Sequence, residues 1–336
     1  MRRKKSKTSR PAFRVTFSPR SGVHLEGTIL WMDGFSAQGM AFLSHAHSRV
    51  PSQASQIVTT KQTAVLAGLT GPGLLVSPFD RPFSVGKLDL ELLSSGHIPG
   101  AASLLVRWGG TELLYAGSVN TEPGLMPTEP CQTRRAEALI LGCRYGHPRF
   151  AFPRPEQAID RLMSIVKSQL LQGRTPVLLL NEPLGKAQGL AALFHQENIE
   201  TWAHRKICDG AARLRDLGLP VGHPRRLTNQ KAQDIQGVVL WLVASRDART
   251  LKQVPKAMFV LVSGLAADPT VIAQMGVADS VVLSDHADFA GLVSYVERVR
   301  ARHVFLLPGK PHPLAATLRK QGLRVTILHP TQLALF

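Results

Sequence analysis

The chain has 336 residues, of which 44% are apolar, and its 40 lysines and arginines exceed its 23 aspartates and glutamates, giving a formal charge of +17. This length is sufficient for one large or two ordinary domains, while no apolar run reaches the roughly 20 residues of a membrane span and no signal-peptide core is found, so we expect a soluble, cytoplasmic protein without a membrane partner. The spacing of Cys131, Cys143 and Cys208 argues against a disulfide framework or a zinc ribbon.

The excess of positive charge favours a polyanionic partner, because each phosphate that a basic side chain neutralises releases counterions. Nucleic acid is the natural candidate. Residues 1–12 are predicted to form a basic disordered arm, in which Arg2, Arg3, Lys4 and Lys5 are nucleic-acid-binding candidates; a tail that only increases solubility is the alternative. Since aromatic residues make up only 6% of the chain, backbone contacts are expected to dominate over base stacking.

The first part of the chain has the pattern of short strands separated by glycine and proline turns. Strands are predicted at 88–93, 103–108 and 111–115, and the pair Gly109-Gly110 between the last two is a hairpin signal.

After Pro153 the hydrophobic period changes to that of helices alternating with buried strands, which predicts a parallel βαβ layer. From Val281 the chain returns to the first unit. The elements predicted here are a helix at 158–170, a strand at 176–180, a helix that Pro183 opens, a strand at 281–283, a helix at 289–299, a strand at 304–307, a helix at 313–321 and a strand at 325–328.

Three short segments carry residues suited to metal chemistry. An apolar run that ends at Leu43 leads to His45 and His47, and on an extended strand these two side chains would share a face. Segment 95–100 (Ser-Gly-His-Ile-Pro-Gly) adds His97, and segment 283–289 (Leu-Ser-Asp-His-Ala-Asp-Phe) adds His286. Any one of these histidines alone is more typical of a core or turn position.

Together and in this order, the segments resemble the metallo-β-lactamase fold and, within it, the β-CASP nucleases, most closely the ligase-associated DNA exonucleases. The resemblance implies an α/β protein, a metallo-β-lactamase αββα sandwich with an inserted β-CASP α/β domain. The implied boundaries are 13–150 for the first part of the sandwich, 151–278 for the β-CASP domain and 279–336 for the C-terminal part of the sandwich. It also implies nucleic acid as the partner, with DNA favoured over RNA and neither excluded, and a ligase or a helicase as possible protein partners.

The metal site of that family is incomplete in this sequence. The first family motif reads His-x-His-x-Asp-His, and its last two positions hold Arg49 and Val50. Ser118 stands at the bridging aspartate, Gly142 at the β-CASP acid and Pro308 at the terminal histidine. The positions that would hold the first metal, His45, His47 and His97, are intact. The resemblance therefore implies at most one zinc ion, bound by three histidines with an open fourth position.

The resemblance also assigns roles to other residues. His286 matches the histidine that protonates the leaving group, and Asp33, twelve residues before His45, matches the aspartate that supports the histidine loop. Arg49 could clamp a phosphate oxygen in place of the second cation, or it could only fill the vacated position. Asp285 and Asp288 are alternative caps for the helix that follows.

The segment 184–188 (Leu-Gly-Lys-Ala-Gln) resembles a family segment at a helix start, where free amides and a lysine form a phosphate seat. Gly185 and Lys186 are therefore further nucleic-acid-binding candidates, and an ordinary helix start is the alternative. We expect a nucleic-acid-binding homologue of a β-CASP DNA exonuclease with weak or absent catalysis. The alternatives are an active metal-dependent exonuclease, a phosphodiester hydrolase that uses a single tri-histidine zinc, and a non-enzymatic scaffold.

Overall fold

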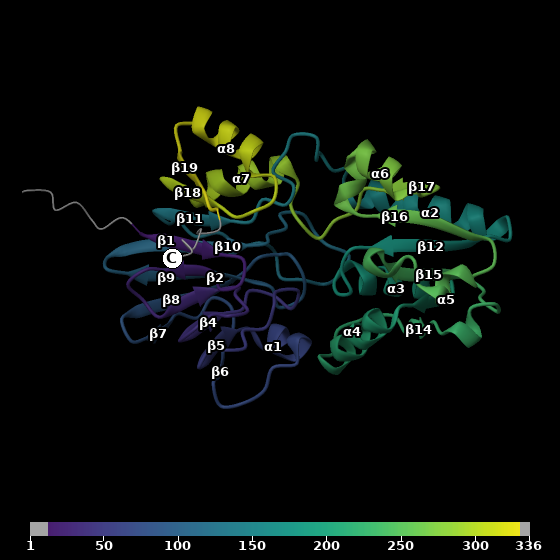
Figure 1. Ribbon diagram of the computed structural model, residues 1–336, viewed down its shortest axis with the longest axis horizontal. Helices are drawn as coiled ribbons and strands as arrows, with labels where there is room; N and C mark the ends of the chain where they lie inside the picture. Colours follow the sequence, from purple (N-terminus) through teal and green to yellow (C-terminus); the bar gives the residue numbers. More distant parts are fainter. Residues whose placement is uncertain (1–12, 330–336) are drawn as a thin grey trace, which may run out of the picture.

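The computed structural model describes residues 13–329, and its strands form three β-sheets (Figure 1). The predicted contacts of Arg2, Arg3, Lys4 and Lys5 lie outside the described residues. Two of the sheets pack together in one unit, and the third belongs to a second unit beside it. The fold is mixed α/β, as expected.

The first sheet has six strands in chain order: β1 (Val15–Ser18), β2 (Gly22–Leu25), β3 (Leu30–Met32), β4 (Met40–Phe42), β5 (Gln56–Thr59) and β6 (Leu74–Val76). The second sheet contains β7 (Phe83–Val85), β8 (Leu88–Ser94), β9 (Ala102–Trp108), β10 (Thr111–Gly117), β11 (Ala138–Leu141), β18 (His303–Leu306) and β19 (Arg324–Ile327). Its spatial order is β19-β18-β11-β10-β9-β8-β7. The predicted hairpin is confirmed, because Gly109 and Gly110 join β9 to β10 with φ values of 59° and 75°, which the tight turn requires.

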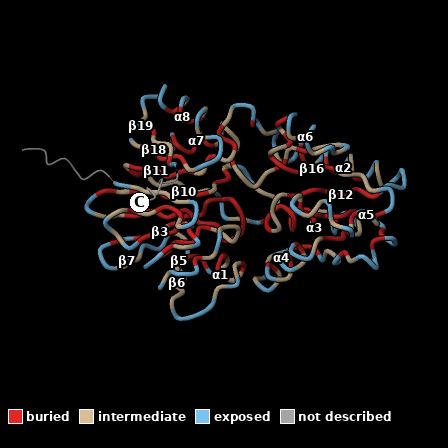
Figure 2. The backbone as a smooth tube through the Cα atoms, in the orientation of Figure 1, coloured by how far each residue is buried: buried red, intermediate tan, exposed pale blue. Residues whose placement is uncertain are grey.

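Apolar side chains from both sheets meet in one core, which makes this unit a β-sandwich. Phe42 and Met40 of the first sheet and Leu92 and Tyr115 of the second belong to the same buried cluster. Helices α7 (Phe289–Val299) and α8 (Pro311–Lys320) cover the outer face of the second sheet, where Leu292 and other apolar residues are buried against it. In Figure 2 the buried backbone follows the strands through the interior of the unit.

The third sheet is entirely parallel and confirms the predicted βαβ layer. Its strands are β12 (Thr175–Leu180), β13 (Thr201–Ala203), β14 (Arg225–Arg226), β15 (Val238–Leu242), β16 (Ala257–Val262) and β17 (Asp279–Val281), in the order β14-β13-β15-β12-β16-β17. One face packs against α2 (Pro155–Leu171), α3 (Lys186–Gln196) and α4 (Arg205–Asp216). The other face packs against α5 (Arg249–Lys252), α6 (Pro269–Met275) and the 3-10 segments at 229–231, 243–245 and 264–267.

Several predicted boundaries are wrong by two or three residues, and two of these deviations concern α3 and β17. Helix α3 begins at Lys186 and not at Pro183, because Gly185 has a φ of 85°, which lies outside the helical region. Strand β17 covers Asp279–Val281 and pairs with β16 in the parallel sheet, so the strand predicted at 281–283 lies two residues earlier, and the chain returns to the first unit only after Val281. Both deviations occur where the two units meet.

The two units contact each other beyond the connecting segments. Helix α1 (Lys61–Ala67) packs against α4, and the Arg213 guanidinium donates to the carbonyl oxygen of Leu66 at 2.6 Å. Thr60 caps α1 by accepting a hydrogen bond from the Thr63 amide. None of the helices between residues 13 and 329 combines the length and apolarity that crossing a bilayer requires.

Candidate metal centre

Three histidines from two loops of the sandwich converge on one point. One nitrogen of each of His45, His47 and His97 lies within 4.8 Å of the others, and the ring centroids are 4.9 to 5.5 Å apart. The predicted convergence is confirmed, but the predicted route to it is wrong. Strand β4 ends at Phe42, and His45 and His47 lie in a turn that the Ser48 amide closes onto the His45 carbonyl oxygen. The turn, not strand alternation, aims both rings at the same point.

The protein holds Nδ1 of each ring and leaves a buried Nε2 without a partner in two of them. Nδ1 of His97 lies 2.6 Å from the carbonyl oxygen of Asp285, and His47 is hydrogen-bonded to the backbone of Leu184. Since a carbonyl oxygen only accepts, the proton must be on Nδ1 and Nε2 must be a bare acceptor. The Nε2 atoms of His47 and His97 are buried and have no hydrogen-bond partner. Orphaned acceptors of this kind are costly unless a cation occupies the space between them.

A hydrogen-bond relay orients the third ring. Asp33 accepts hydrogen bonds from the Ser44 amide (2.9 Å), from Ser44 Oγ and from the Tyr115 hydroxyl (2.8 Å). Because the Ser44 hydroxyl donates to Asp33, it accepts from Nδ1 of His45, which lies 2.7 Å away. Nε2 of His45 is then free to bind an ion. Asp33 therefore stands where the resemblance placed a supporting aspartate, behind the histidine loop and not among the three nitrogen donors.

The electrostatic environment keeps the three imidazoles neutral. Burial lowers the pKa of His45 well below its usual value, and the neighbouring His97 and His47 lower it further. Burial lowers the pKa of His47 to about 3 and also lowers that of His97. The neutral ring is the form that binds a metal, so no proton has to leave before an ion binds at neutral pH.

His286 lies directly beside this cluster. Its ring centroid is 4.2 Å from that of His97, and it lines a cavity of about 330 Å³ together with Asp33, His45 and Arg144. Burial is the main cause that holds the pKa of His286 well below its usual value. Between residues 13 and 329, no hydrogen bond fixes either of its ring nitrogens. This agrees with the absence of an orienting carboxylate at Gly142.

The positions that the resemblance assigned to a second metal lie in the cavity but carry no metal ligands. Ser118, Gly142 and Pro308 line the cavity of the histidines. A Cβ atom at Gly142 would lie 2.6 Å from the carbonyl oxygen of Gly117, so the backbone has closed over the space that an acidic side chain would need. Within residues 13–329, the tri-histidine cluster is the one group of three or more His, Cys, Asp or Glu side chains placed to hold an ion.

The structure places a different arginine at the site from the predicted one. Arg49 is exposed and does not line the cavity, so the predicted clamp on phosphate does not fit its position. Arg144 does line the cavity, and its charge contributes to the lowered pKa values of His286, His97 and His47. Among the described residues it forms one ion pair, with Glu182 at 3.4 Å, which leaves much of the guanidinium available. The available sequence signal was its place three residues after the end of β11.

Gly185 and Lys186 are engaged inside the protein. The Lys186 amide donates to Asp285 Oδ2 at 2.9 Å, and its Nζ donates to the carbonyl oxygen of Leu283 at 2.7 Å. A Cβ atom at Gly185 would lie 2.6 Å from Ile98 and 2.9 Å from Asp285. The Lys186 amide and ammonium groups, which the predicted phosphate seat requires, are therefore already engaged within the protein. These contacts instead hold the segment whose Asp285 carbonyl accepts from His97.

The alternative roles of two aspartates are resolved by their hydrogen bonds. Asp288 is the N-cap of α7, since its side chain accepts from the Gly291 amide at 2.8 Å. Asp285 instead links α3 to the histidine loop.

Comparison with known proteins gives distant relatives. No protein-family model matches the chain. A probable DNA ligase of Opitutus terrae is 28% identical over 308 residues, which cover 90% of this chain and 30% of the relative. An uncharacterized protein of Synechocystis is 28% identical over 207 residues, 51% of this chain and 36% of that protein. The chain thus spans about a third of the length of these curated relatives.

A solved structure has a similar arrangement of helices and strands. The crystal structure of a protein of unknown function from Enterococcus faecalis superposes with a TM-score of 0.54 at 13% identity, covering 80% of this chain and 74% of that one. At this identity the likeness concerns the arrangement of the elements alone. The chain is therefore similar over nearly its whole length to part of a probable DNA ligase and similar in fold to a protein whose function is unknown.

Proposed function

We propose that the chain is a nucleic-acid-binding protein with the metallo-β-lactamase fold and an inserted β-CASP domain, which holds one zinc ion and hydrolyses phosphodiesters weakly. The two packed sheets with outer helices support the first part of this proposal. The parallel unit supports the second, since its elements run from α2 to β17, whose last residue is Val281, and lie between the two parts of the sandwich.

Two observations support nucleic acid, and DNA in particular, as the partner. The chain carries 17 more positive than negative formal charges, which favours a polyanion. A relative named as a probable DNA ligase matches 90% of the chain. The matching part of that relative would then act on or near DNA.

The observation that carries the proposal is the pair of buried, unpartnered Nε2 atoms of His47 and His97. With Nδ1 of each ring already engaged and His45 oriented through Ser44, the three nitrogens form a donor set that fits zinc. A zinc ion bound by three histidines supplies a Lewis acid and lowers the pKa of a coordinated water toward roughly 7.

The other residues of the cavity have separate tasks. Arg144 presents a permanently charged, planar donor group to the cavity and binds a phosphate oxygen of the substrate. His286 faces the same cavity beside His97 and is the candidate proton donor to the leaving oxygen; because burial lowers its pKa, the charged form is scarce at neutral pH, which agrees with weak catalysis. Asp33 touches no substrate and acts through Ser44 by fixing the tautomer of His45.

We propose weak catalysis because the second cation has no ligand group. In two-metal phosphodiesterases the paired ions stabilise both the attacking and the leaving oxygen. Arg144 supplies charge near the vacated position but cannot generate hydroxide, and His286 lacks an orienting carboxylate. We therefore expect the protein to bind nucleic acid but to hydrolyse it slowly.

The test is degradation of 5′-labelled single-stranded DNA by purified protein, with and without a zinc chelator. The proposal expects slow cleavage that the chelator abolishes and that a His45→Ala, His97→Ala double variant lacks. Identical rates for the wild-type protein and the double variant would refute hydrolysis. If DNA binding then persisted, the chain would be a binding protein without catalysis; loss of both would favour a scaffold for an acidic protein.

A further inference from the structure

A second cavity, of about 480 Å³, lies at the opposite end of the second sheet from the histidines. The parallel strands β11, β18 and β19 and the neighbouring β10 all begin here, and Ala138, His303 and Arg324 are first residues of strands. The carboxyl ends of β10, β11 and β18 lead to the histidine cavity. A strand of four residues spans roughly 13 Å, so the two cavities are separated by about the length of these strands.

Four arginines surround this cavity, namely Arg135, Arg300, Arg302 and Arg324. All four are exposed, and none forms an ion pair or a side-chain hydrogen bond with another residue of the described range 13–329. Many other arginines of the protein are paired; Arg107 and Arg134, for example, both contact carboxylates. The positive charges of these four arginines are therefore not neutralised by other side chains of the described range.

The acidic residues of the cavity do not cancel this charge. Glu112 pairs with Arg107 at 2.9 Å, so its charge is already neutralised. The Glu137 carboxylate accepts a hydrogen bond from the Glu112 amide at 2.7 Å. Both carboxylates thus have partners of their own, and two of them stand against four guanidinium groups, so the cavity attracts anions.

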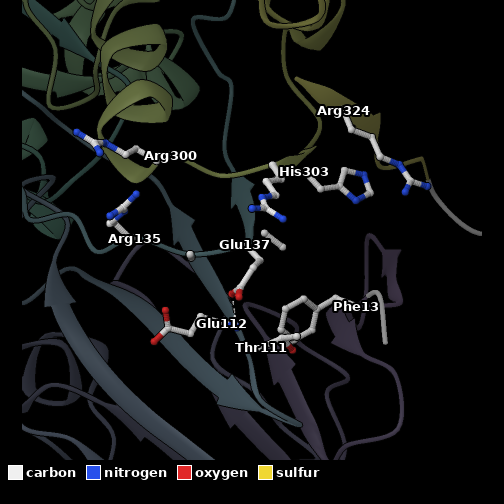
Figure 3. Close-up of a pocket in the computed structure, with 11 residues that line it drawn as sticks. Phe13, Thr111, Glu112, Arg135, Glu137, Arg300, His303 and Arg324 are labelled. Atoms are coloured by element: carbon white, nitrogen blue, oxygen red, sulfur yellow. Dashed lines mark hydrogen bonds between the residues drawn. The ribbon is translucent and has the colours of Figure 1, made fainter. Parts of the chain in front are cut away.

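Arg135, Arg300 and Arg324 form a row across the cavity and do not converge on one point. In Figure 3, Arg135 and Arg300 lie on one side of the cavity and Arg324 on the other, with His303 between them. His303 and Arg324 are in-register neighbours on adjacent strands, which are about 4.8 Å apart in any sheet. A compact anion would contact only part of this row, whereas an extended polyanion can contact all of it. Phe13 adds an aromatic ring at the edge.

We propose that this groove, defined by Arg135, Arg300, Arg302 and Arg324 and called the rear groove, binds the sugar–phosphate backbone of a nucleic-acid strand. The inference rests on the proposed nucleic-acid partner and adds a second contact region remote from the histidines. A guanidinium group matches two phosphate oxygens at once, which explains why the row consists of arginine. A strand held in the rear groove stays bound to the protein while another part of it reaches the histidine cavity.

The experiment compares two variants with equal loss of charge. The first is Arg135→Gln, Arg302→Gln, Arg324→Gln; Arg300 is retained because it ends α7 with a φ of 56°. The control is Arg226→Gln, Arg249→Gln, Lys252→Gln, three exposed residues of the second unit that line neither cavity. Binding of a fluorescent 30-nucleotide single strand is measured by anisotropy from low to high salt.

The rear-groove variant is expected to bind roughly tenfold more weakly, with the slope of log affinity against log salt reduced by about 2, since each lost phosphate contact removes about 0.7. The control is expected to stay within about twofold. Equal losses in both variants, or no loss in the first, would overturn the proposal. So would a rear-groove variant that loses binding only to polyglutamate, which would make the site one for acidic protein. Failure of the wild-type protein to bind the strand would instead refute the proposed partner itself.

Discussion

The substitution Asp33→Asn tests the relay that orients His45. Asp33 accepts from both hydroxyls around it, and the Ser44 hydroxyl donates to Asp33 while it accepts from Nδ1 of His45. Asparagine has nearly the same size and tolerates the φ of 52° at this position. Its amide group, however, donates where Oδ2 accepted. The Ser44 hydroxyl must then reverse and donate to His45, which places the ring proton on Nε2, toward the metal position.

The size of the effect follows from this reversal. Substitution of a residue that supports a metal ligand reduces metal affinity by about 10- to 100-fold, which corresponds to about 1.4 to 2.7 kcal/mol. In the variant the Tyr115 hydroxyl also faces the asparagine NH2 group and so loses its hydrogen-bond acceptor. Tyr115→Phe is the matched control, because it removes one donor to Asp33 without reversing the relay; its zinc affinity is expected to change less than about threefold.

Zinc affinity is measured by competition with a chromophoric chelator at neutral pH, and thermal unfolding confirms that each variant is folded. An Asp33→Asn protein that is folded and binds zinc within twofold of the wild-type protein would refute the relay. Equal losses in Asp33→Asn and Tyr115→Phe would also contradict it, since they would show that the number of hydrogen bonds matters and their direction does not.

Further substitutions test the other assignments. Arg144→Gln is expected to weaken binding of single-stranded DNA about tenfold, because one charge-assisted phosphate contact is lost, while the exposed Arg49→Gln changes it less than about twofold; equal effects would contradict the assignment to Arg144. Gly185→Ala is expected to lower the free energy of unfolding by about 3 kcal/mol, since positive φ and contact with Ile98 both oppose a Cβ atom. Gly218→Ala, with a similar φ but open space, is expected to cost about 1 kcal/mol in urea unfolding; equal costs would show that the close packing is unimportant.

The features that could be predicted from the sequence depend on local patterns. Two segments of strand length joined by Gly109-Gly110 identified the hairpin of β9 and β10, and the change of period after Pro153 identified the parallel unit. The three histidines could be selected because each belongs to a short motif and the motifs occur in a fixed order. Their convergence followed from that order, although the turn that carries His45 and His47 did not.

The remaining features depend on contacts between distant parts of the chain. Asp285, whose carbonyl oxygen accepts from His97, is 188 residues away from it in sequence. Lys186 resembled an exposed phosphate ligand by its position before a helix, yet it is buried against Leu283, 97 residues further along. Arg144 belongs to no motif, and only the loop after β11 brings it to the cavity. Sequence patterns identify candidate side chains, but tertiary contacts determine which of them remain available to a ligand.

The metal content of the purified protein tests the central claim most directly. Elemental analysis after dialysis against trace zinc is expected to find about one equivalent of zinc per chain, and almost none in a folded His47→Ala, His97→Ala variant. Two equivalents would show that residues other than these histidines complete a second site. Absence of zinc from the wild-type protein would contradict the account, because the unpartnered nitrogens of His47 and His97 would then have no ion to bind.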